Sequence, residues 1–234
     1  MAMGKLRQHM WEELRLLNRS EATIKEYLAA VGRYSRYHGK RPDILGRDDV
    51  RKYLLHLAVE RKLSFSSVNT ANCALRFFYR HVCGRVDVVE EIAFQRKQRQ
   101  LPRILSGAEI MRIFEATKIP KNRVILMTMY ACGLRVSEAC KMKVTDIDGD
   151  RGAIRVSEGK GGKTRYVMLS NCLRDHLRNY YREYRPDRNG WLFPGRNPRR
   201  PITSRAVQLA FEEAKNRAGV TKPATCHSLR HSFA

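Results

Sequence analysis

Apolar residues recur at intervals of three and four through most of the first hundred positions, which is the spacing of one helical face. The clearest example follows Ser20, a good N-cap, and ends at Gly39, a good C-terminal residue. The same spacing predicts three more helices, over about 10–17, 48–57 and 66–82. The apolar positions between Ser20 and Gly39 are Ile24, Tyr27, Leu28, Val31, Tyr34 and Tyr37.

After residue 104 the pattern changes from helical to mixed. Ser106 and Glu109 form a capping box that predicts a helix through 110–114. Two short segments, 152–156 and 165–169, have β-type patterns and flank the Gly-rich sequence EGKGGKT, so they predict a hairpin. Further helices are predicted over about 122–130, from 135 to before 144, over 173–184 and 204–218, and at the start of ATCHSLRHSFA.

Between residues 85 and 103 the periodicity fades into QRKQRQLPR, a polar and basic stretch with one proline. Such a composition is typical of an interdomain linker. The pattern therefore predicts a helical domain over 1–84, a linker over 85–103 and an α+β domain over 104–234. The fold class is mainly α with a small β-sheet.

The charge of the chain narrows the choice of partner. Lys and Arg number 46 against 23 Asp and Glu, giving a formal charge of +23, and the excess occurs in both halves. A cation-rich surface attracts nucleic acid, because each Lys or Arg that neutralises a phosphate releases a condensed counterion. A passive RNA-binding protein has the same signature, so charge alone assigns no chemistry.

Several other classes are excluded by the sequence pattern. The longest strongly apolar run, 124–134, is about half of the roughly 20 residues that a membrane helix needs. The N-terminal residues have no apolar signal segment, so we expect a cytoplasmic protein without a membrane partner. The six cysteines form no C-x-x-C pair, which predicts reduced thiols, no metal site and no cofactor.

Three clusters in the second part carry candidate chemistry. In 132–138 (CGLRVSE) a glycine turn delivers an arginine to the start of a helix, with a carboxylate three residues further on. In 159–163 (GKGGK) glycines allow a lysine to approach a nucleic-acid groove closely. In 227–230 (HSLR) an imidazole and a guanidinium share one helical face. Two guanidinium groups, an amine and an imidazole suit the stabilisation of a phosphoryl transition state without metal.

In this order, behind a basic four-helix module, the motifs GLRVSE, GKGGKTR and HSLRHSFA resemble the tyrosine recombinase (phage integrase) family, in particular Xer-like and integron-type integrases. The resemblance covers almost the whole chain. It implies a SAM-like core-binding domain and a catalytic domain that clamp duplex DNA. It further implies that Arg135 and Arg230 hold the scissile phosphate, that Lys160 is the general acid, that His227 assists proton transfer and that Glu138 supports the first arginine.

The sequence departs from the family pattern at its end. The resemblance implies a tyrosine nucleophile a few tens of residues after His-x-x-Arg, but only four residues follow Arg230 and the last tyrosine is Tyr184. We therefore expect a C-terminally truncated catalytic domain that binds DNA without cleaving it. The alternative is a non-catalytic DNA-binding remnant or a regulator at recombination sites. The resemblance also implies inverted-repeat DNA sites and, for full-length members, a homotetramer on DNA.

Less specific interpretations compete with each candidate. Lys163 lies in the same turn as Lys160, and the family motif favours Lys160. His231 competes with His227, and the i, i+3 spacing to Arg230 favours His227. Residues expected to pack rather than to react or to stack on bases are Tyr180, Tyr181 and Tyr184, and the stripe Tyr27, Tyr34 and Tyr37.

Overall fold

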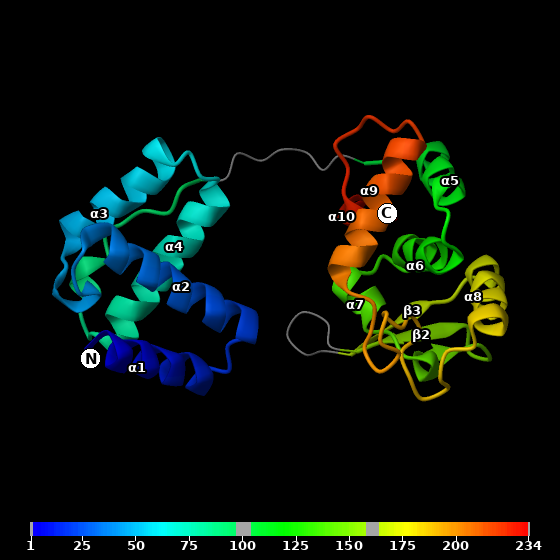
Figure 1. Ribbon diagram of the computed structural model, residues 1–234, viewed down its shortest axis with the longest axis horizontal. Helices are drawn as coiled ribbons and strands as arrows, with labels where there is room; N and C mark the ends of the chain where they lie inside the picture. Colours follow the sequence, from blue (N-terminus) through cyan, green and yellow to red (C-terminus); the bar gives the residue numbers. More distant parts are fainter. Residues whose placement is uncertain (1, 97–103, 158–163, 234) are drawn as a thin grey trace. The chain divides into compact units, whose positions relative to one another are not determined.

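The computed structural model describes residues 2–96, 104–157 and 164–233 (Figure 1). The chain divides into two compact units, Met1–Arg99 (the first unit) and Gln100–Ala234 (the second unit). Each unit has its own hydrophobic core. The fold is mainly helical with one small sheet, which confirms the predicted fold class.

The first unit is built from four α-helices, as the periodicity predicts. The second helix begins after Ser20, whose Oγ accepts a hydrogen bond from the Thr23 backbone N–H (3.2 Å), and it ends at Gly39 with φ +63°. The helices following it continue into single π-helical turns, His56–Glu60 and Phe78–Val82. The four α-helices are α1 (Ala2–Leu16), α2 (Glu21–His38), α3 (Arg47–Leu55) and α4 (Phe65–Phe77).

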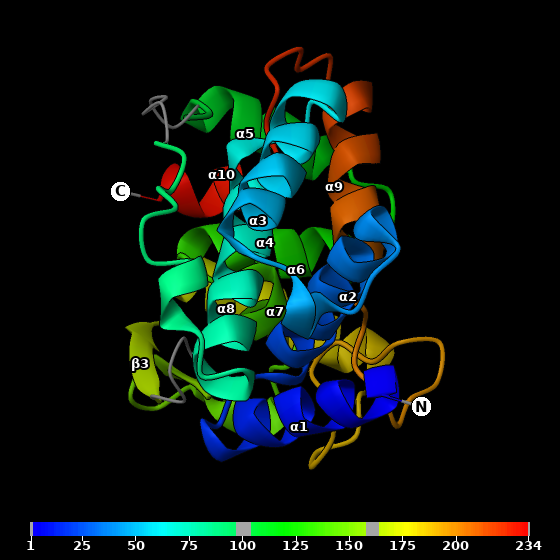
Figure 2. The same cartoon turned by 90° about the vertical axis from the view of Figure 1, so that its left-hand side faces the viewer.

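The core of the first unit forms where α2 packs along α4, with α1 across one end (Figure 2). The hydroxyls of Tyr34 and Tyr79 meet there at 3.1 Å, and the Tyr79 hydroxyl donates to the Pro42 carbonyl (2.7 Å). Burial raises the pKa of Tyr79 to about 12. Tyr27 and Tyr37 are partly buried against the same core, so the aromatic stripe is a packing feature, as predicted.

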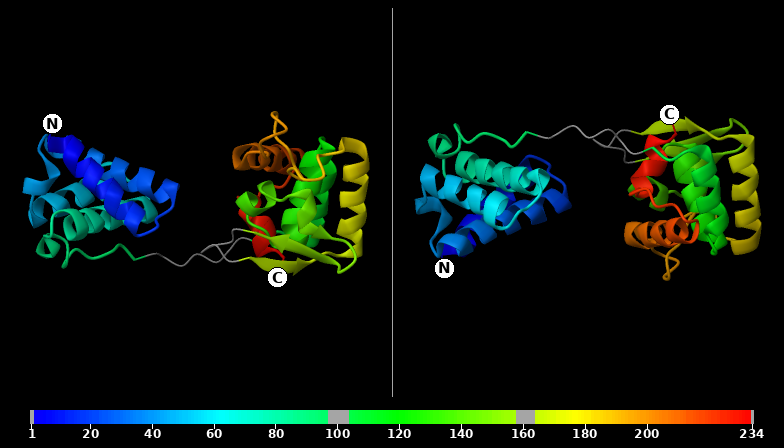
Figure 3. Two further views of the ribbon diagram at one scale, coloured as in Figure 1. Left: turned by 90° about the horizontal axis from the view of Figure 1, so that it is seen from below. Right: turned by 90° about the horizontal axis from the view of Figure 1, so that it is seen from above.

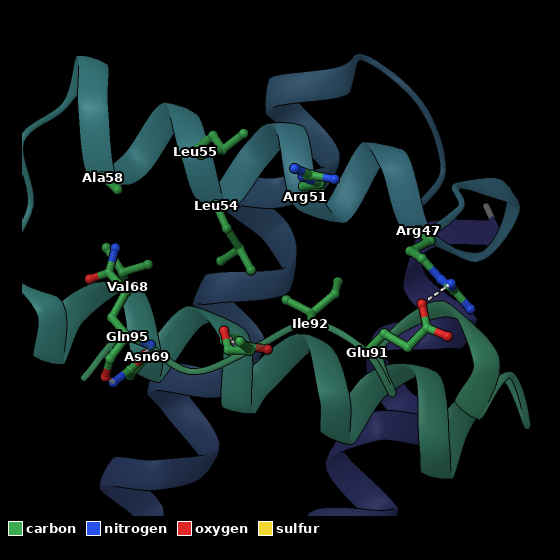
Figure 4. Close-up of a pocket in the computed structure, with 12 residues that line it drawn as sticks. Arg47, Arg51, Leu54, Leu55, Ala58, Val68, Asn69, Glu91, Ile92 and Gln95 are labelled. Carbon is green, nitrogen blue, oxygen red and sulfur yellow. Dashed lines mark hydrogen bonds and ion pairs between the residues drawn. The ribbon is translucent and has the colours of Figure 1, made fainter.

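The chain after α4 does not leave the first unit where the sequence pattern predicts a linker. Val88 and Val89 are buried in the core of the first unit. In Figure 4, Ile92 lies opposite α3, and Glu91 forms an ion pair with Arg47. The chain is therefore bound to this unit as far as Gln95, whose backbone N–H donates to Oδ1 of Asn69 (2.9 Å). These few apolar residues span less than the two turns that a helical period needs to become visible.

In the second unit the described residues form six α-helices and a three-stranded antiparallel sheet of order β1-β2-β3. Val156 pairs with Arg165, and Ala153 pairs with Met168, as expected for two arms of a hairpin. The turn between them, 158–163, lies outside the described residues. The elements are α5 (Gly107–Ala116), α6 (Pro120–Ala131), α7 (Val136–Cys140), β1 (Ile147–Asp148), β2 (Ala153–Val156), β3 (Arg165–Met168), α8 (Asn171–Tyr184), α9 (Ser204–Arg217) and α10 (Cys226–His231).

Helix α6 is central to the second unit. It packs against α8 on one side and against α9 and α10 on the other (Figure 3). Ile125, Leu126 and Met129 are fully buried, as expected for a helix that other helices cover on both sides. Within the described residues no helix combines the length and apolar character needed to cross a bilayer.

Candidate functional site

A sharp turn between α6 and α7 positions the first arginine of the candidate site. Gly133 adopts φ +58°, a conformation that favours glycine, and its backbone N–H donates to the Tyr130 carbonyl (3.2 Å). Leu134 follows and is completely buried. Arg135 is then the N-cap of α7, so its side chain leaves the backbone where the helix starts.

Glu138 holds Arg135 in place. Its Oε2 accepts the Arg135 backbone N–H (2.9 Å), and its Oε1 accepts Nη1 of the same residue (2.7 Å). Arg165, the first residue of β3, binds both carboxylate oxygens, at 3.0 and 2.8 Å. Only 3% of the Glu138 side chain is exposed, so these hydrogen bonds replace the water that the carboxylate has lost.

Helix α10 brings the second candidate arginine to the same place. Nη1 of Arg230 donates to the Gly133 carbonyl (2.6 Å) and lies 3.8 Å from Oε2 of Glu138. Arg135, Glu138 and Arg230 thus come together from segments almost one hundred residues apart. We call the set Arg135, Glu138, Arg165 and Arg230 the arginine cluster.

The arginine cluster has the electrostatics of an anion site. Three guanidinium groups surround one carboxylate, and about a third of each arginine side chain remains exposed. Burial alone would raise the pKa of Glu138, but hydrogen bonds from Arg165 and Arg135 outweigh it and lower the pKa to about 2. The carboxylate stays ionised, orients the guanidinium groups and leaves them a positive excess that a phosphate can neutralise.

The remaining candidates are less well placed. His227 lies one helical turn before Arg230 on α10 and is exposed, as is the rival His231. Neither imidazole ring forms a hydrogen bond with another described residue. Lys160 and its rival Lys163 fall in 158–163, outside the described residues, so the structure does not place the expected general acid.

Arg165 is the member of the cluster that the sequence reasoning missed. The signal that could have found it is the alternation in RYVM, which puts Arg165 and Val167 on one face of the strand. In the structure these two residues are half-buried, while Tyr166 and Met168 are exposed. A basic residue at the inward position of a strand next to a carboxylate-bearing motif indicates an ion pair. The glycine-rich turn drew attention to its lysines instead.

All three tyrosines of α8 are predicted to pack, and the structure shows Tyr180 buried, with Tyr184 stacked on it and Tyr181 more exposed. The buried Tyr180 hydroxyl donates to the Leu192 carbonyl (3.0 Å), and its ring stacks on Tyr184 at 4.9 Å between centroids. Tyr181 and Tyr184 remain partly exposed. Across the described parts of the chain, no three His, Cys, Asp or Glu side chains gather as metal ligands would.

The first unit also has a basic groove of its own. It has a volume of about 660 Å³ and lies between α2, α4 and the turn after α3. Arg33, Arg36 and Arg61 line it together with Tyr37. Both units therefore have partly exposed guanidinium groups, in a groove in the first unit and in the arginine cluster in the second.

Comparison with protein families gives two matches that together cover most of the chain. The model described as "Phage integrase family" matches residues 98–234. The model described as "Phage integrase, N-terminal SAM-like domain" matches residues 6–86.

Curated proteins give matches of the same kind over nearly the full chain. The chain is 44% identical over 235 residues to "Putative integrase/recombinase y4qK" of Sinorhizobium fredii, covering 100% of this chain and 76% of that protein. It is 35% identical over 229 residues to "Tyrosine recombinase XerA" of Thermococcus kodakarensis, covering 94% and 77%.

Solved structures agree in fold. A crystal structure of XerA recombinase matches with 28% identity and a TM-score of 0.51, over 99% of this chain and 82% of that one. A lambda integrase(75-356) dimer bound to a COC' core site matches with 18% identity and a TM-score of 0.76, over 98% and 87%. At that identity the second match supports the arrangement of elements only.

Proposed function

This chain belongs to the phage integrase family of tyrosine recombinases, and from that premise we propose that it is a site-specific DNA recombinase subunit that binds duplex DNA and positions one phosphodiester. The observation that carries the proposal is the arginine cluster. Several integrase structures with the same fold are described as DNA complexes, including a lambda integrase tetramer bound to a Holliday junction. We propose the corresponding partner here: duplex DNA with inverted-repeat sites, bound by a homotetramer in full-length members.

The arginine cluster would act on the phosphate as follows. Arg135 and Arg230 donate hydrogen bonds to the non-bridging oxygens, where negative charge develops during displacement. Glu138 and Arg165 are positioning residues, since each acts through the guanidinium groups rather than on the phosphate. The net positive charge of the cluster favours the more highly charged transition state over the diester.

Two further groups complete the proposed machinery. Lys160 would protonate the leaving 5′ oxygen, and His227 would assist that proton transfer. His227 is on the same helix as Arg230 and one turn away, which is compatible with action on a common phosphate. Neither group needs a metal for this role.

The nucleophile would be a tyrosine, and the 234 residues contain none after Tyr184. Arginine, lysine and histidine stabilise the attack of a tyrosine hydroxyl but do not replace it. We therefore propose that a polypeptide of these residues binds DNA and leaves it uncut. The second candidate function, a DNA-binding remnant or regulator at recombination sites, follows from the same observation.

The two compact units, each with its own hydrophobic core, support the predicted domains. We propose that 1–84 is the core-binding domain, 104–234 the catalytic domain and 85–103 the connection between them. The first unit also holds the chain as far as Gln95, which lies within the stretch that the sequence pattern assigns to the connection. The basic groove lined by Arg33, Arg36 and Arg61 would contact DNA phosphates from the first unit.

A duplex-binding titration tests the phosphate site. Arg135→Ala and Arg230→Ala should each weaken binding to an inverted-repeat duplex about tenfold, because a hydrogen bond to a charged group contributes roughly 1.5 to 3 kcal/mol. The slope of log affinity against log salt should fall by about 0.9 for each lost phosphate contact. The matched control is Arg112→Ala, an exposed arginine on α5 with no hydrogen bond or ion pair to a described residue.

Equal affinities for Arg135→Ala, Arg230→Ala and the control would remove the arginine cluster from the DNA interface. A competition with RNA of the same length separates the recombinase proposal from a passive RNA-binding protein, which should prefer RNA or show no preference. A nicked suicide substrate then tests cleavage. We expect no covalent adduct with the 234-residue polypeptide, and an adduct would refute the claim that it is inactive.

A further inference from the structure

Helix α8 carries a row of arginines that the proposed phosphate site does not use. Arg174, Arg178 and Arg182 are four residues apart, so they follow one face of the helix at steps of about 6 Å. Together with Arg188 from the following loop they line a groove of about 660 Å³. Leu177 and Tyr181 of α8 and Ile147 of β1 provide apolar surface in the same groove. We call it the α8 groove.

The charge in the α8 groove is not compensated within the protein. None of its four arginines forms an ion pair with a described residue, although ion pairs occur on most other surfaces. The acidic residues of α8, Asp175 and Glu183, each follow an arginine by one position, and neither forms an ion pair with an arginine of the row, although Asp175 and Arg178 are three residues apart. Asp148 and Asp187, beside the groove, accept hydrogen bonds from the backbone of Arg151 and Asn189.

Arg174 provides a second, independent observation. It is only half exposed, and its Nε is buried without a hydrogen-bond partner among the described residues. A buried donor without an acceptor costs free energy, and no described residue compensates this cost. The terminal Nη atoms of Arg174 are accessible and have no hydrogen-bond partner among the described residues, so they are the atoms that an anion in the groove can contact.

The α8 groove is distinct from the arginine cluster. Helix α6 packs between α8 and α10, which carries Arg230 (Figure 3). No residue of the cluster lines the groove. A duplex held at the cluster therefore does not occupy the groove through the same phosphate.

We propose that the α8 groove binds a single strand of nucleic acid through its phosphodiester backbone, in addition to the duplex held at the arginine cluster. A row of three guanidinium groups about 12 Å long matches a few successive phosphates of one strand. The partly exposed ring of Tyr181 offers a face on which an unpaired base can stack. A base of a duplex is already stacked and paired, so only a single strand can use both features.

A labelled twelve-residue oligothymidylate tests this proposal on the full chain. The double variant Arg178→Glu with Arg182→Glu should weaken its binding at least tenfold. The salt slope should fall by about 1.4, since each phosphate contact of a single strand contributes about 0.7. The matched control, Arg112→Glu with Lys118→Glu, makes the same change in net charge at exposed residues outside the groove, and should have a much smaller effect.

The outcomes are distinguishable from those of the duplex titration. The α8 variant should bind the inverted-repeat duplex as the charge-matched control does, whatever the effect of Arg135→Ala. An equal loss of oligothymidylate binding in both double variants would overturn the proposal, leaving only general charge attraction. Displacement of the oligonucleotide by dodecaglutamate at equal concentration would assign the groove to an acidic peptide instead. An equally large and selective loss for a twelve-base-pair duplex would assign it to double-stranded DNA.

Discussion

The ionised carboxylate of Glu138 holds the arginine cluster together, because it accepts hydrogen bonds from both Arg135 and Arg165. Its pKa is lowered from an ordinary 4.5 to about 2, and only 3% of its side chain is exposed. Such a difference between folded and unfolded states contributes about 3 kcal/mol to the free energy of unfolding at neutral pH. Glu138→Gln should therefore lower the stability of the second unit by about 3 kcal/mol at pH 7.

The pH dependence of this effect follows from the direction of the pKa change. Because the folded pKa lies below the unfolded one, the stabilisation is complete above about pH 4.5 and is lost as the pH falls toward about 2. The difference between the unsubstituted chain and Glu138→Gln should shrink to about 1 kcal/mol near pH 3. At pH 7 it should be at its maximum.

Urea unfolding measures this difference without adding ions that would screen the cluster. The chain has two tryptophans, Trp11 in the first unit and Trp191 in the second. In a Trp11→Phe background, the fluorescence of Trp191 reports the second unit alone. The control is Glu115→Gln, an exposed glutamate on α5, which should change stability by less than about 0.5 kcal/mol. A loss for Glu138→Gln that equals the control, or that stays constant from pH 7 to pH 3, would contradict the assigned role of the carboxylate.

Three further predictions concern the arginine cluster, the glycine turn that precedes it and the core of the first unit. Arg165→Ala should weaken duplex binding several-fold because Glu138 loses its bidentate partner, and Arg165→Lys should restore only part of it, as fluorescence anisotropy can measure. Gly133→Ala should cost about 1 kcal/mol, a fall of a few degrees in Tm, because φ is +58° there, whereas Gly133→Asn should cost less since asparagine tolerates this conformation better. Tyr79→Phe should destabilise the first unit by about 1 to 2 kcal/mol, because the Pro42 carbonyl loses its donor. The free energy of unfolding of the second unit should not change, as the fluorescence of Trp11 and Trp191 can show for each unit separately.

The helices could be predicted from the sequence because their signals are local. Ser20 and Gly39 bound α2, and Ser106 with Glu109 begins α5, as the capping rules require. A cap is formed by neighbouring residues, so it is visible without knowledge of the rest of the fold. β1, with only two residues, has too short a pattern to be detected.

The site was only partly predictable, because it depends on contacts between distant segments. Arg135 and Glu138 are linked by helix spacing, and their pairing could be expected. The approach of Arg230 to the Gly133 carbonyl depends on how α10 packs against α6, which no local pattern reports. Arg165 was missed because its partner is 27 residues earlier and because the adjacent turn offered two more conspicuous lysines.

The order in which the arginine cluster is encoded has a consequence for the nascent protein. A chain emerging from the ribosome folds its N-terminal domain first, and the first unit, with its basic groove, is complete long before Arg230 is translated. The Gly133 carbonyl acquires the Arg230 donor only after a further 97 residues have been translated. During synthesis the first unit can therefore fold, with the arginines of its groove in place, while the arginine cluster of the second unit still lacks one of its members.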